Sequence, residues 1–286
     1  MTTHTIDPGF LRPMLGRREE VSHKGDYGHL LLVCGSRTMP GAAVMATGAA
    51  LKSGCGLVTL HSTSRTLDAV VAAFPSAMLS EDPDACFSLV PEGLLRFDAI
   101  AVGPGLGVAP QTAGALSKLL LRARETGIPM VLDADALNIL SAKPALKKSI
   151  PPGSVMTPHD AELRRLLGGE LPDDKDQAVS ALCRETGCVL VSKGFHSEIY
   201  TPEGEKYVNA SGNPGLAKGG SGDVLTGLVG GLLARGHSAL EAAALGTWIH
   251  GYAGDCLTAE CTAEAYNSRD LIDALYKGFR TLSDNR

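Results

Sequence analysis

The stretch from Gly212 to Gly236, GNPGLAKGGSGDVLTGLVGGLLARG, joins a glycine-rich turn to an apolar helix. Its apolar residues recur at the spacing of one helix face: Val224, Leu225, Leu228, Val229, Leu232 and Leu233. A glycine-rich turn leading into a helix presents free backbone N–H groups and the positive end of the helix dipole. The stretch therefore predicts an anion site in front of a helix.

Asp223 places a carboxylate at the mouth of this predicted anion site. An aspartate there can cap the helix. It can also act as a base or positioning group toward an acceptor hydroxyl, since phosphoryl transfer needs such a group together with an anion cradle and a cation. Gly219 to Gly222 could supply the cradle, and Lys193 or Lys218 the cation. Both interpretations stay open, and the surrounding glycines favour catalysis.

Composition bounds the class of protein. At 286 residues, with 44% hydrophobic and 20% charged residues, the chain suits one soluble α/β domain. The net charge of −5 argues against nucleic acid as a partner. Seven scattered cysteines without a CxxC pair indicate reduced thiols rather than structural zinc. Neither a signal peptide nor a membrane-spanning run is evident, so we expect a cytoplasmic protein that binds no membrane.

Strand and helix patterns alternate along the chain, which predicts a mostly parallel sheet covered on both faces. Residues 1–28 are expected to be irregular, with one short helix near 8–15. The predicted strands are 29–34, 57–61, 77–79, 99–102, 129–132, 155–157 and 188–192, with a hairpin of 197–201 and 206–209. The predicted helices are 64–73, 110–125, 239–258 and 269–283, besides the one that begins near Asp223. An Ala-rich helix is also predicted after Pro40-Gly41, ending near Gly54 or Gly56, and another begins at 158–162.

Glycine and polar residues follow several predicted strands directly. They are Gly35-Ser36, Gly103-Pro104-Gly105, Asp133-Ala134-Asp135, Thr157-Pro158-His159 and Lys193-Gly194. The carboxyl ends of parallel strands meet at one edge of a sheet, so these loops are expected to face one site. The sequence contains no G-x-x-x-x-G-K-[ST] phosphate loop, and VGPGLG lacks the G-x-G-x-x-G spacing of a dinucleotide fold.

The glycine-rich turn ending in Gly222-Asp223 resembles that of the ribokinase-like superfamily. Seven ordered motifs between about His23 and Phe279 resemble the ADP- or ATP-dependent NAD(P)H-hydrate dehydratase family: HKGDYGHLLLVCGS, MPGAAVMA, VGPGLG, VLDADALN, TPHDAE, VSKG and GNPGLAKGGSGDVLTG. The resemblance implies a three-layer α/β/α sandwich with a mostly parallel sheet. It also implies a hydro-lyase that repairs hydrated NADH and NADPH, acting on the S-epimer.

The resemblance implies roles for individual residues. Asp223 would deprotonate the 6-hydroxyl of the hydrate, which would attack the terminal phosphate of the nucleotide before phosphate is eliminated. The implied anion hole is Gly219, Gly220, Ser221 and Gly222. The implied nucleotide contacts are Lys193, Gly194, Phe195, His196, Ser197 and Gly222. The implied substrate contacts are Ala43, Gly105, His159, Asn213 and Asp223. Mg²⁺ is expected through the nucleotide phosphates, with no ligand assigned to the chain.

The resemblance also shapes expectations for the whole chain. Residues 1–22 are expected to be an N-terminal arm and 23–286 one catalytic domain, a stand-alone form that works with a separate epimerase. A homotetramer is expected from the family. The motifs are compatible with ADP or ATP as the nucleotide and with hydrated NADH or hydrated NADPH as the substrate. One motif departs from the family pattern, because Asp160-Ala161 follow His159 where Pro-Gly is usual.

Other interpretations remain beside these. The chain could be a small-molecule kinase of the same fold, such as a hydroxyethylthiazole kinase, or a catalytically silent nucleotide-binding protein. His159 could be a solvent-facing helix start, and Lys193 a solvated lysine. Asp133 and Asp135 could be turn and capping residues, and for Asp135 an N-cap is favoured over metal ligation. Lys218 could only balance phosphate charge, and His250 could belong to the core or an interface.

Overall fold

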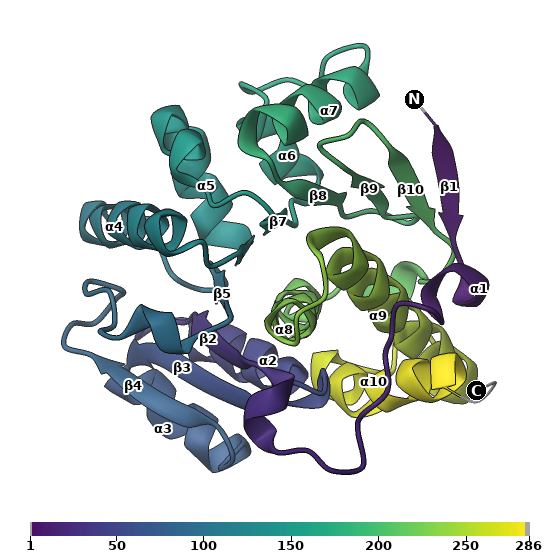
Figure 1. The fold of residues 1–286 in the computed structure, drawn as a ribbon, viewed down its shortest axis with the longest axis horizontal. Helices are drawn as coiled ribbons and strands as arrows, with labels where there is room; N and C mark the ends of the chain where they lie inside the picture. The colour runs from purple at the N-terminus through teal and green to yellow at the C-terminus, as the bar shows by residue number, and fades with distance from the viewer. Residues whose placement is uncertain (1, 284–286) are drawn as a thin grey trace.

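A single ten-stranded sheet forms the middle layer of the computed structural model, which describes residues 2–283 (Figure 1). The strands are β1 (Thr3–Ile6), β2 (His29–Val33), β3 (Leu57–Thr63), β4 (Met78–Asp82), β5 (Ala99–Val102), β6 (Met130–Leu132), β7 (Val155–Met156), β8 (Val189–Ser192), β9 (Glu198–Tyr200) and β10 (Lys206–Asn209). Their order is β1-β10-β9-β8-β7-β6-β5-β2-β3-β4. Only β9 runs antiparallel to its neighbours, which confirms the predicted mostly parallel sheet and its hairpin.

The central strands end at the same level. Val33 pairs with Val102, Val102 with Leu132, Leu132 with Met156, and Met156 with Leu190. This row is buried, as expected for strands covered on both faces. The loops after these strands therefore leave the sheet along one edge, and this is where ligands bind in open parallel sheets.

Helices cover both faces of the sheet and create two hydrophobic cores. On one face lie α2 (Pro40–Lys52), α3 (Ser64–Ala73), α8 (Ser221–Ala234), α9 (Ala239–Cys261) and α10 (Ser268–Ser283). On the other lie α4 (Pro110–Thr126), α5 (Ala134–Ala142), α6 (Asp160–Leu166) and α7 (Lys175–Thr186). The predicted three-layer α/β/α fold is thus confirmed (Figure 1). Among residues 2–283, no helix combines the length and apolar character needed to cross a membrane.

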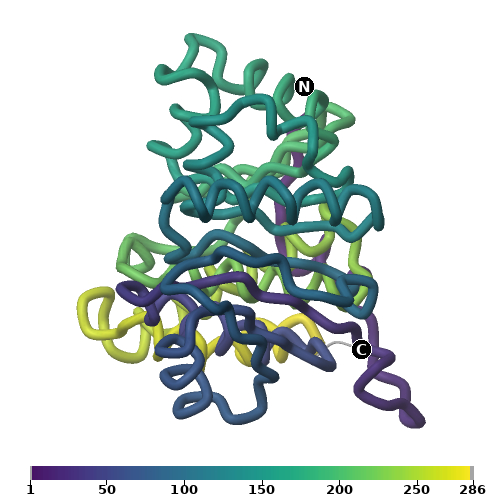
Figure 2. Tube along the Cα trace, turned by 90° about the vertical axis from the view of Figure 1, so that its left-hand side faces the viewer, coloured from purple at the N-terminus to yellow at the C-terminus, as the bar shows by residue number. Residues whose placement is uncertain are grey.

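The N-terminal residues differ from the prediction. The short helix is present as α1 (Pro8–Leu11), but residues 3–6 form β1, which pairs in parallel with β10. Ile6 and Leu11 are fully buried in the core. In Figure 2 the purple N-terminal segment lies among the green segments near residue 200. The expectation of an irregular start is wrong here because four residues can join a sheet edge through backbone hydrogen bonds without a strong sequence pattern.

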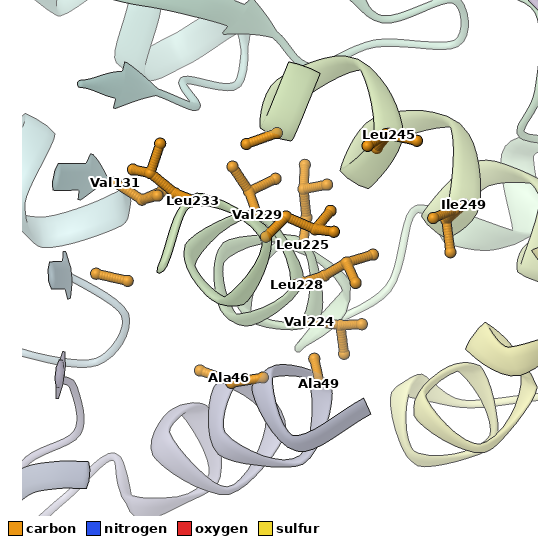
Figure 3. Packing of buried hydrophobic residues seen from close by; sticks show 14 of the residues in the cluster. Ala46, Ala49, Val131, Val224, Leu225, Leu228, Val229, Leu233, Leu245 and Ile249 are labelled. Carbon is orange, nitrogen blue, oxygen red and sulfur yellow. The ribbon is translucent and has the colours of Figure 1, made fainter. Parts of the chain in front are cut away.

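Helix α8 is the central element of its core. Figure 3 shows Val224 and Leu228 of α8 above Ala46 and Ala49 of α2, with Leu245 of α9 on the opposite side. The helices approach so closely that a Cβ at Gly227 would overlap the Ala46 carbonyl oxygen. Glycine and alanine at this contact hold the N-terminus of α8 at a defined place beneath the strand ends.

Candidate active site

A buried lysine–aspartate pair lies where β6, β8 and α8 meet. The Nζ of Lys193 donates to Asp133 Oδ1 at 2.7 Å, and the hydroxyl of Thr226 donates to Asp133 Oδ2 at 2.6 Å. The Asp133 side chain is 2% exposed and that of Lys193 19%. The interpretation of Lys193 as a solvated lysine is therefore wrong, because its charge is fixed beside the first turn of α8.

Asp223 is the third residue of α8, and the helix N-cap is Gly220, in the left-handed conformation. The capping interpretation of Asp223 is therefore wrong. Within residues 2–283 no hydrogen bond or ion pair engages its carboxylate, which leaves both oxygens available to a ligand. Burial, the charge of Asp133 and that of Asp135 raise the pKa of Asp223 to about 7, against the opposing effect of Lys193. A carboxyl group with this pKa can accept a proton near neutral pH.

His159 and Glu162 form a capping box at the start of α6. His159 Nδ1 accepts from the Ala161 amide at 3.1 Å, and Glu162 accepts from the His159 amide at 2.9 Å. His159 is thus a helix start, half exposed, and it also lines the cavity described next. The unusual Asp160-Ala161 occupies exposed positions and leaves this box intact. Glu162 is buried, with Oε2 4.0 Å from Lys193 Nζ.

A cavity of about 600 Å³ opens in front of α8. It brings together these residues predicted for the site: Lys193, Gly194, Phe195, Ser197, Gly222, Ser221, His159 and Asn213. Its wall does not include His196, Gly219, Gly220, Ala43, Gly105 or Asp223. Phe195 is 64% exposed at the rim, as expected for an aromatic ring available to a ligand.

Ala43 and Gly105 lie outside this cavity, at the start of α2. A Cβ at Gly105 would come within 2.8 Å of the Ala42 Cβ, and one at Gly35 within 2.9 Å of the Ala43 Cβ. Burial raises the pKa of the Cys34 thiol, and the charges of Asp223 and Asp133 raise it further. Asp223 is therefore close enough to the strand before α2 to act on Cys34, and in the chain it directly follows Gly222, which lines the large cavity.

The loop before α8 is held by α9 and the segment that follows it. Asp255 accepts from the Gly212 amide at 2.9 Å and from Asn213 Nδ2 at 2.8 Å. Asn213 Oδ1 accepts from the Gly215 amide at 2.9 Å and the Thr258 hydroxyl at 3.0 Å. The side chain of Asn213 thus shapes the loop rather than reaching freely into the cavity.

Lys218 is likewise committed to protein groups. Its Nζ donates to the Ala263 carbonyl at 2.6 Å and also to the carbonyl of Tyr266, whose ring lies 4.1 Å from the ammonium. The hypothesis that Lys218 only balances phosphate charge is not supported by these contacts. Lysine here ties the glycine-rich turn to the loop after α9.

Comparisons with known proteins identify the family of this chain. Residues 30–277 match the family model described as NAD(P)H-hydrate dehydratase. The chain belongs to the NAD(P)H-hydrate dehydratase family.

Two relatives illustrate the range of this family. An ADP-dependent (S)-NAD(P)H-hydrate dehydratase of Neisseria meningitidis is 43% identical over 84% of this chain and 80% of its own length. A bifunctional NAD(P)H-hydrate repair enzyme of Moorella thermoacetica is 38% identical over 98% of this chain. The chain spans about half the length of that bifunctional relative, 54%.

Solved structures of the family share the whole fold. An ADP/ATP-dependent NAD(P)H-hydrate dehydratase from Bacillus subtilis, co-crystallised with ATP and Mg²⁺, superposes with a TM-score of 0.85, 29% identity and 99% coverage of both chains. A hydroxyethylthiazole kinase from Pyrococcus horikoshii has a TM-score of 0.65 at 15% identity over 94% of this chain and 93% of its own, which shows a common fold only.

Two aspartates in a loop predicted to face the site make contacts that the sequence does not indicate. Asp133 is the N-cap residue of α5, but its side chain makes no capping hydrogen bond and accepts instead from Lys193 and Thr226. Asp135 is not the N-cap, and its Oδ2 accepts from the Gly107 amide at 2.8 Å. The position of Asp133 directly after a buried strand predicts its place near the site, but no local pattern indicates its partners.

A second cavity, of about 660 Å³, is lined by Arg17, Arg18, Lys52 and Arg235 with no carboxylate among its lining residues. Arg18 and Arg235 donate to the carbonyls of Gly54 and Ser53, which end α2. Arginines there satisfy a helix C-terminus. We assign this cavity no role in the reaction, because none of the residues around Asp223 lines it.

Proposed function

We propose that this chain uses ADP or ATP to dehydrate the S-epimer of hydrated NADH or NADPH to the reduced cofactor. One observation carries the proposal: the Asp223 carboxylate, which has no hydrogen-bond or ion-pair partner among residues 2–283, has a pKa of about 7 and lies in the first turn of α8, next to Gly222 of the large cavity. This placement suits a base that takes a proton from a hydroxyl beside a bound phosphate. Family membership supplies the substrate class.

The proposed chemistry has two steps. Asp223 accepts the proton of the 6-hydroxyl as that oxygen attacks the terminal phosphorus. A new O–P bond forms, and the bond to the leaving nucleotide breaks. The C6–O bond then breaks, phosphate departs and a proton leaves C5, which restores the ring double bond. Phosphorylation converts hydroxide, a poor leaving group, into phosphate, a good one.

The first turn of α8 and Lys193 would stabilise the transferring group. Amides from Gly219 to Gly222 and the helix dipole offer positive potential to an anion. Lys193, Gly194, Phe195, His196 and Ser197 would border the nucleotide, and His159, Ala43 and Gly105 the hydrate. Asn213 would act mainly by shaping the loop, given its contacts with Asp255 and Thr258.

Mg²⁺ fits this donor set. No group of three His, Cys, Asp or Glu residues in the described range could hold a metal ion alone. Mg²⁺ commonly takes one or two carboxylates, with phosphates and water completing its shell. Asp133 and Glu162, the buried carboxylates beside Lys193, could supply these oxygens. When bound, the ion would neutralise charge on the phosphates.

The relatives, and not the geometry of this chain, suggest which proteins it works with. Because a relative that is 38% identical is a bifunctional NAD(P)H-hydrate repair enzyme, we propose that an NAD(P)H-hydrate epimerase supplies the S-epimer here. A mixture of epimers should then be consumed only in part until an epimerase is added. We also propose a homotetramer in the cytoplasm, testable by light scattering and by cell fractionation.

One assay tests the proposed activity. The chain is incubated with hydrated NADH and Mg²⁺ plus ADP or ATP, and the absorbance of the reduced nicotinamide ring is followed. Its return supports the proposal, and no return with either nucleotide contradicts it. A stable phosphorylated alcohol would indicate the kinase alternative instead, and nucleotide binding without turnover would indicate a silent binding protein.

Replacing the proposed base gives the first prediction. Asp223→Asn should lower turnover by about 10²–10⁴, the usual effect of losing a general base. The affinity for nucleotide should stay nearly constant, since the asparagine keeps the shape of the site. Single-turnover kinetics and calorimetric titration measure the two quantities. An equal loss of affinity and rate would identify Asp223 as a structural residue.

A further inference from the structure

His250 is a buried polar residue beside the anion site that the proposed mechanism does not use. It lies on α9, is 8% exposed, and also lines the cavity in front of α8. Its Nε2 is 3.0 Å from the carbonyl oxygen of Ser221 and 3.2 Å from the Ser221 hydroxyl oxygen. From the sequence alone, this histidine is expected in the core or at an interface.

The hydrogen-bond partners of the His250 ring show which of its nitrogens carries the proton. A carbonyl oxygen can only accept, so Nε2 must donate to Ser221. Burial lowers the pKa of His250 to about 4, so the ring is neutral at pH 7 and its one proton is on Nε2. The same N–H faces the Ser221 hydroxyl oxygen, which must accept there.

The hydroxyl proton of Ser221 is consequently free to be donated elsewhere. Among residues 2–283 no other hydrogen bond of this hydroxyl is present. Ser221 is the first residue of α8, follows Gly219-Gly220 and lines the cavity. A ligand anion at the helix N-terminus is the acceptor that this position offers.

We propose that His250 is a positioning residue that fixes the Ser221 hydroxyl as a hydrogen-bond donor to the phosphate group bound at the N-terminus of α8. This inference rests on the proposed function. It adds a directed donor to the backbone amides of the anion hole. It also explains why a polar ring is buried here.

Helix α9 holds His250 firmly enough for this task. A Cβ at Gly251, the next residue, would overlap the hydroxyl oxygen of Ser211, so the helix is in close contact with the loop before α8. One turn further along, Asp255 binds the Gly212 and Asn213 amides. Helix α9 therefore contacts both the glycine-rich loop and the first residue of α8.

The test is a double-mutant cycle with His250→Phe and Ser221→Ala. We expect each single variant to lower kcat/KM at least about tenfold, since one donor to a developing oxyanion is worth that or more. If His250 acts through Ser221, the double variant should lose no more than Ser221→Ala alone. His250→Gln keeps an N–H donor and should recover part of the rate. Additive losses, or unchanged kinetics in His250→Phe, would overturn the proposal.

Tyr252→Phe is the matched control. Tyr252 also lies on α9, and the substitution removes the hydroxyl that accepts a hydrogen bond from the Thr281 hydroxyl of α10 at 3.2 Å. Its kinetics should match those of the wild type. A loss as large as that of His250→Phe would show that any disturbance of α9 has this effect, which would also contradict a specific role for His250.

Two measurements do not depend on the dehydration reaction. Nitrogen-15 NMR of the histidine rings should place the His250 proton on Nε2 at pH 7, and a proton on Nδ1 would overturn the inference. A non-hydrolysable ATP analogue should bind several-fold more weakly to His250→Phe than to the wild type, and equal affinity would count against it. If both results hold while hydrated NADH is not dehydrated, the proposed function fails and the donor role stands.

Discussion

Asp133 is the single residue whose charge most influences the proposed base. It is buried, binds Lys193 and Thr226, and raises the pKa of Asp223. Lys193 acts in the opposite direction. Burial, the like charge of Asp133 and the opposing charge of Lys193 together place the pKa of Asp223 near neutral pH, where a carboxylate can both accept a proton and be regenerated.

Asp133→Asn should shift the acid limb of the pH profile of kcat/KM to lower pH by about one unit. Removing a like charge lowers the pKa of Asp223, so the base stays ionised in more acidic solution. Asparagine keeps an oxygen that can accept from Lys193 or Thr226. Asp68→Asn, an exposed change on α3, is the control and should leave the profile in place. An unmoved acid limb in Asp133→Asn would contradict this electrostatic coupling.

The raised pKa of Asp223 also has a cost in stability. The folded chain holds this proton up to about pH 7, whereas the unfolded chain loses it near 3.8. Stability therefore falls as pH rises through this window, and the full penalty is present above pH 7. In thermal denaturation Asp223→Asn should raise Tm by at least about 3 °C at pH 8 and by little at pH 4. An equal change at both pH values would contradict the pKa assignment.

At the scale of elements, α9 acts as a support for the glycine-rich loop. Asp255→Ala removes the acceptor of the Gly212 and Asn213 amides and leaves these donors without their partner. We expect KM for the nucleotide to rise by about tenfold, corresponding to one lost charge-assisted hydrogen bond, with a smaller effect on kcat. Asp273→Ala on α10, an exposed carboxylate, is the control. Unchanged nucleotide KM in Asp255→Ala would refute the supporting role.

The contact between α2 and α8 requires small residues. Gly227→Ala should destabilise the fold by about 1–3 kcal/mol or more, because its Cβ would overlap the Ala46 carbonyl. Gly114→Ala, in the middle of α4 with open space around it, should stabilise by about 0.5–1 kcal/mol. Denaturant unfolding measures both changes. Similar effects of the two substitutions would contradict the close packing described for α8.

Strong local patterns made most elements predictable. Buried strands such as 99–102 and helices such as 64–73 have clear apolar runs or periodicity, and they occur as predicted. Strand β1 and helix α7 were missed, because β1 depends on pairing with a strand about 200 residues away and α7 is mostly polar. Partners distant in the sequence leave no local signal.

For the molecule as a whole, the alternation of strand and helix patterns predicted the fold, and the loops after buried strands predicted where the site lies. Neither pattern predicted the partners of individual side chains. Asp133 meets Thr226 across 93 residues, and His250 meets Ser221 across 29. Such pairs are created by the packing of α8 and α9 against the sheet, which no local pattern describes. The glycine-rich turn singled out Asp223, the family resemblance implied its role as a base toward the 6-hydroxyl, and the structure shows the charges around it.

In the proposed reaction the 6-hydroxyl is phosphorylated, with Asp223 as the base, before its oxygen leaves the ring. An isotope experiment tests this order of steps. Hydrated NADH labelled with oxygen-18 in the 6-hydroxyl is incubated with the chain, Mg²⁺ and unlabelled ADP or ATP, and the released phosphate is analysed by mass spectrometry. We expect one labelled oxygen in the phosphate and none in water. Label in water, with unlabelled phosphate, would contradict phosphorylation of the hydroxyl.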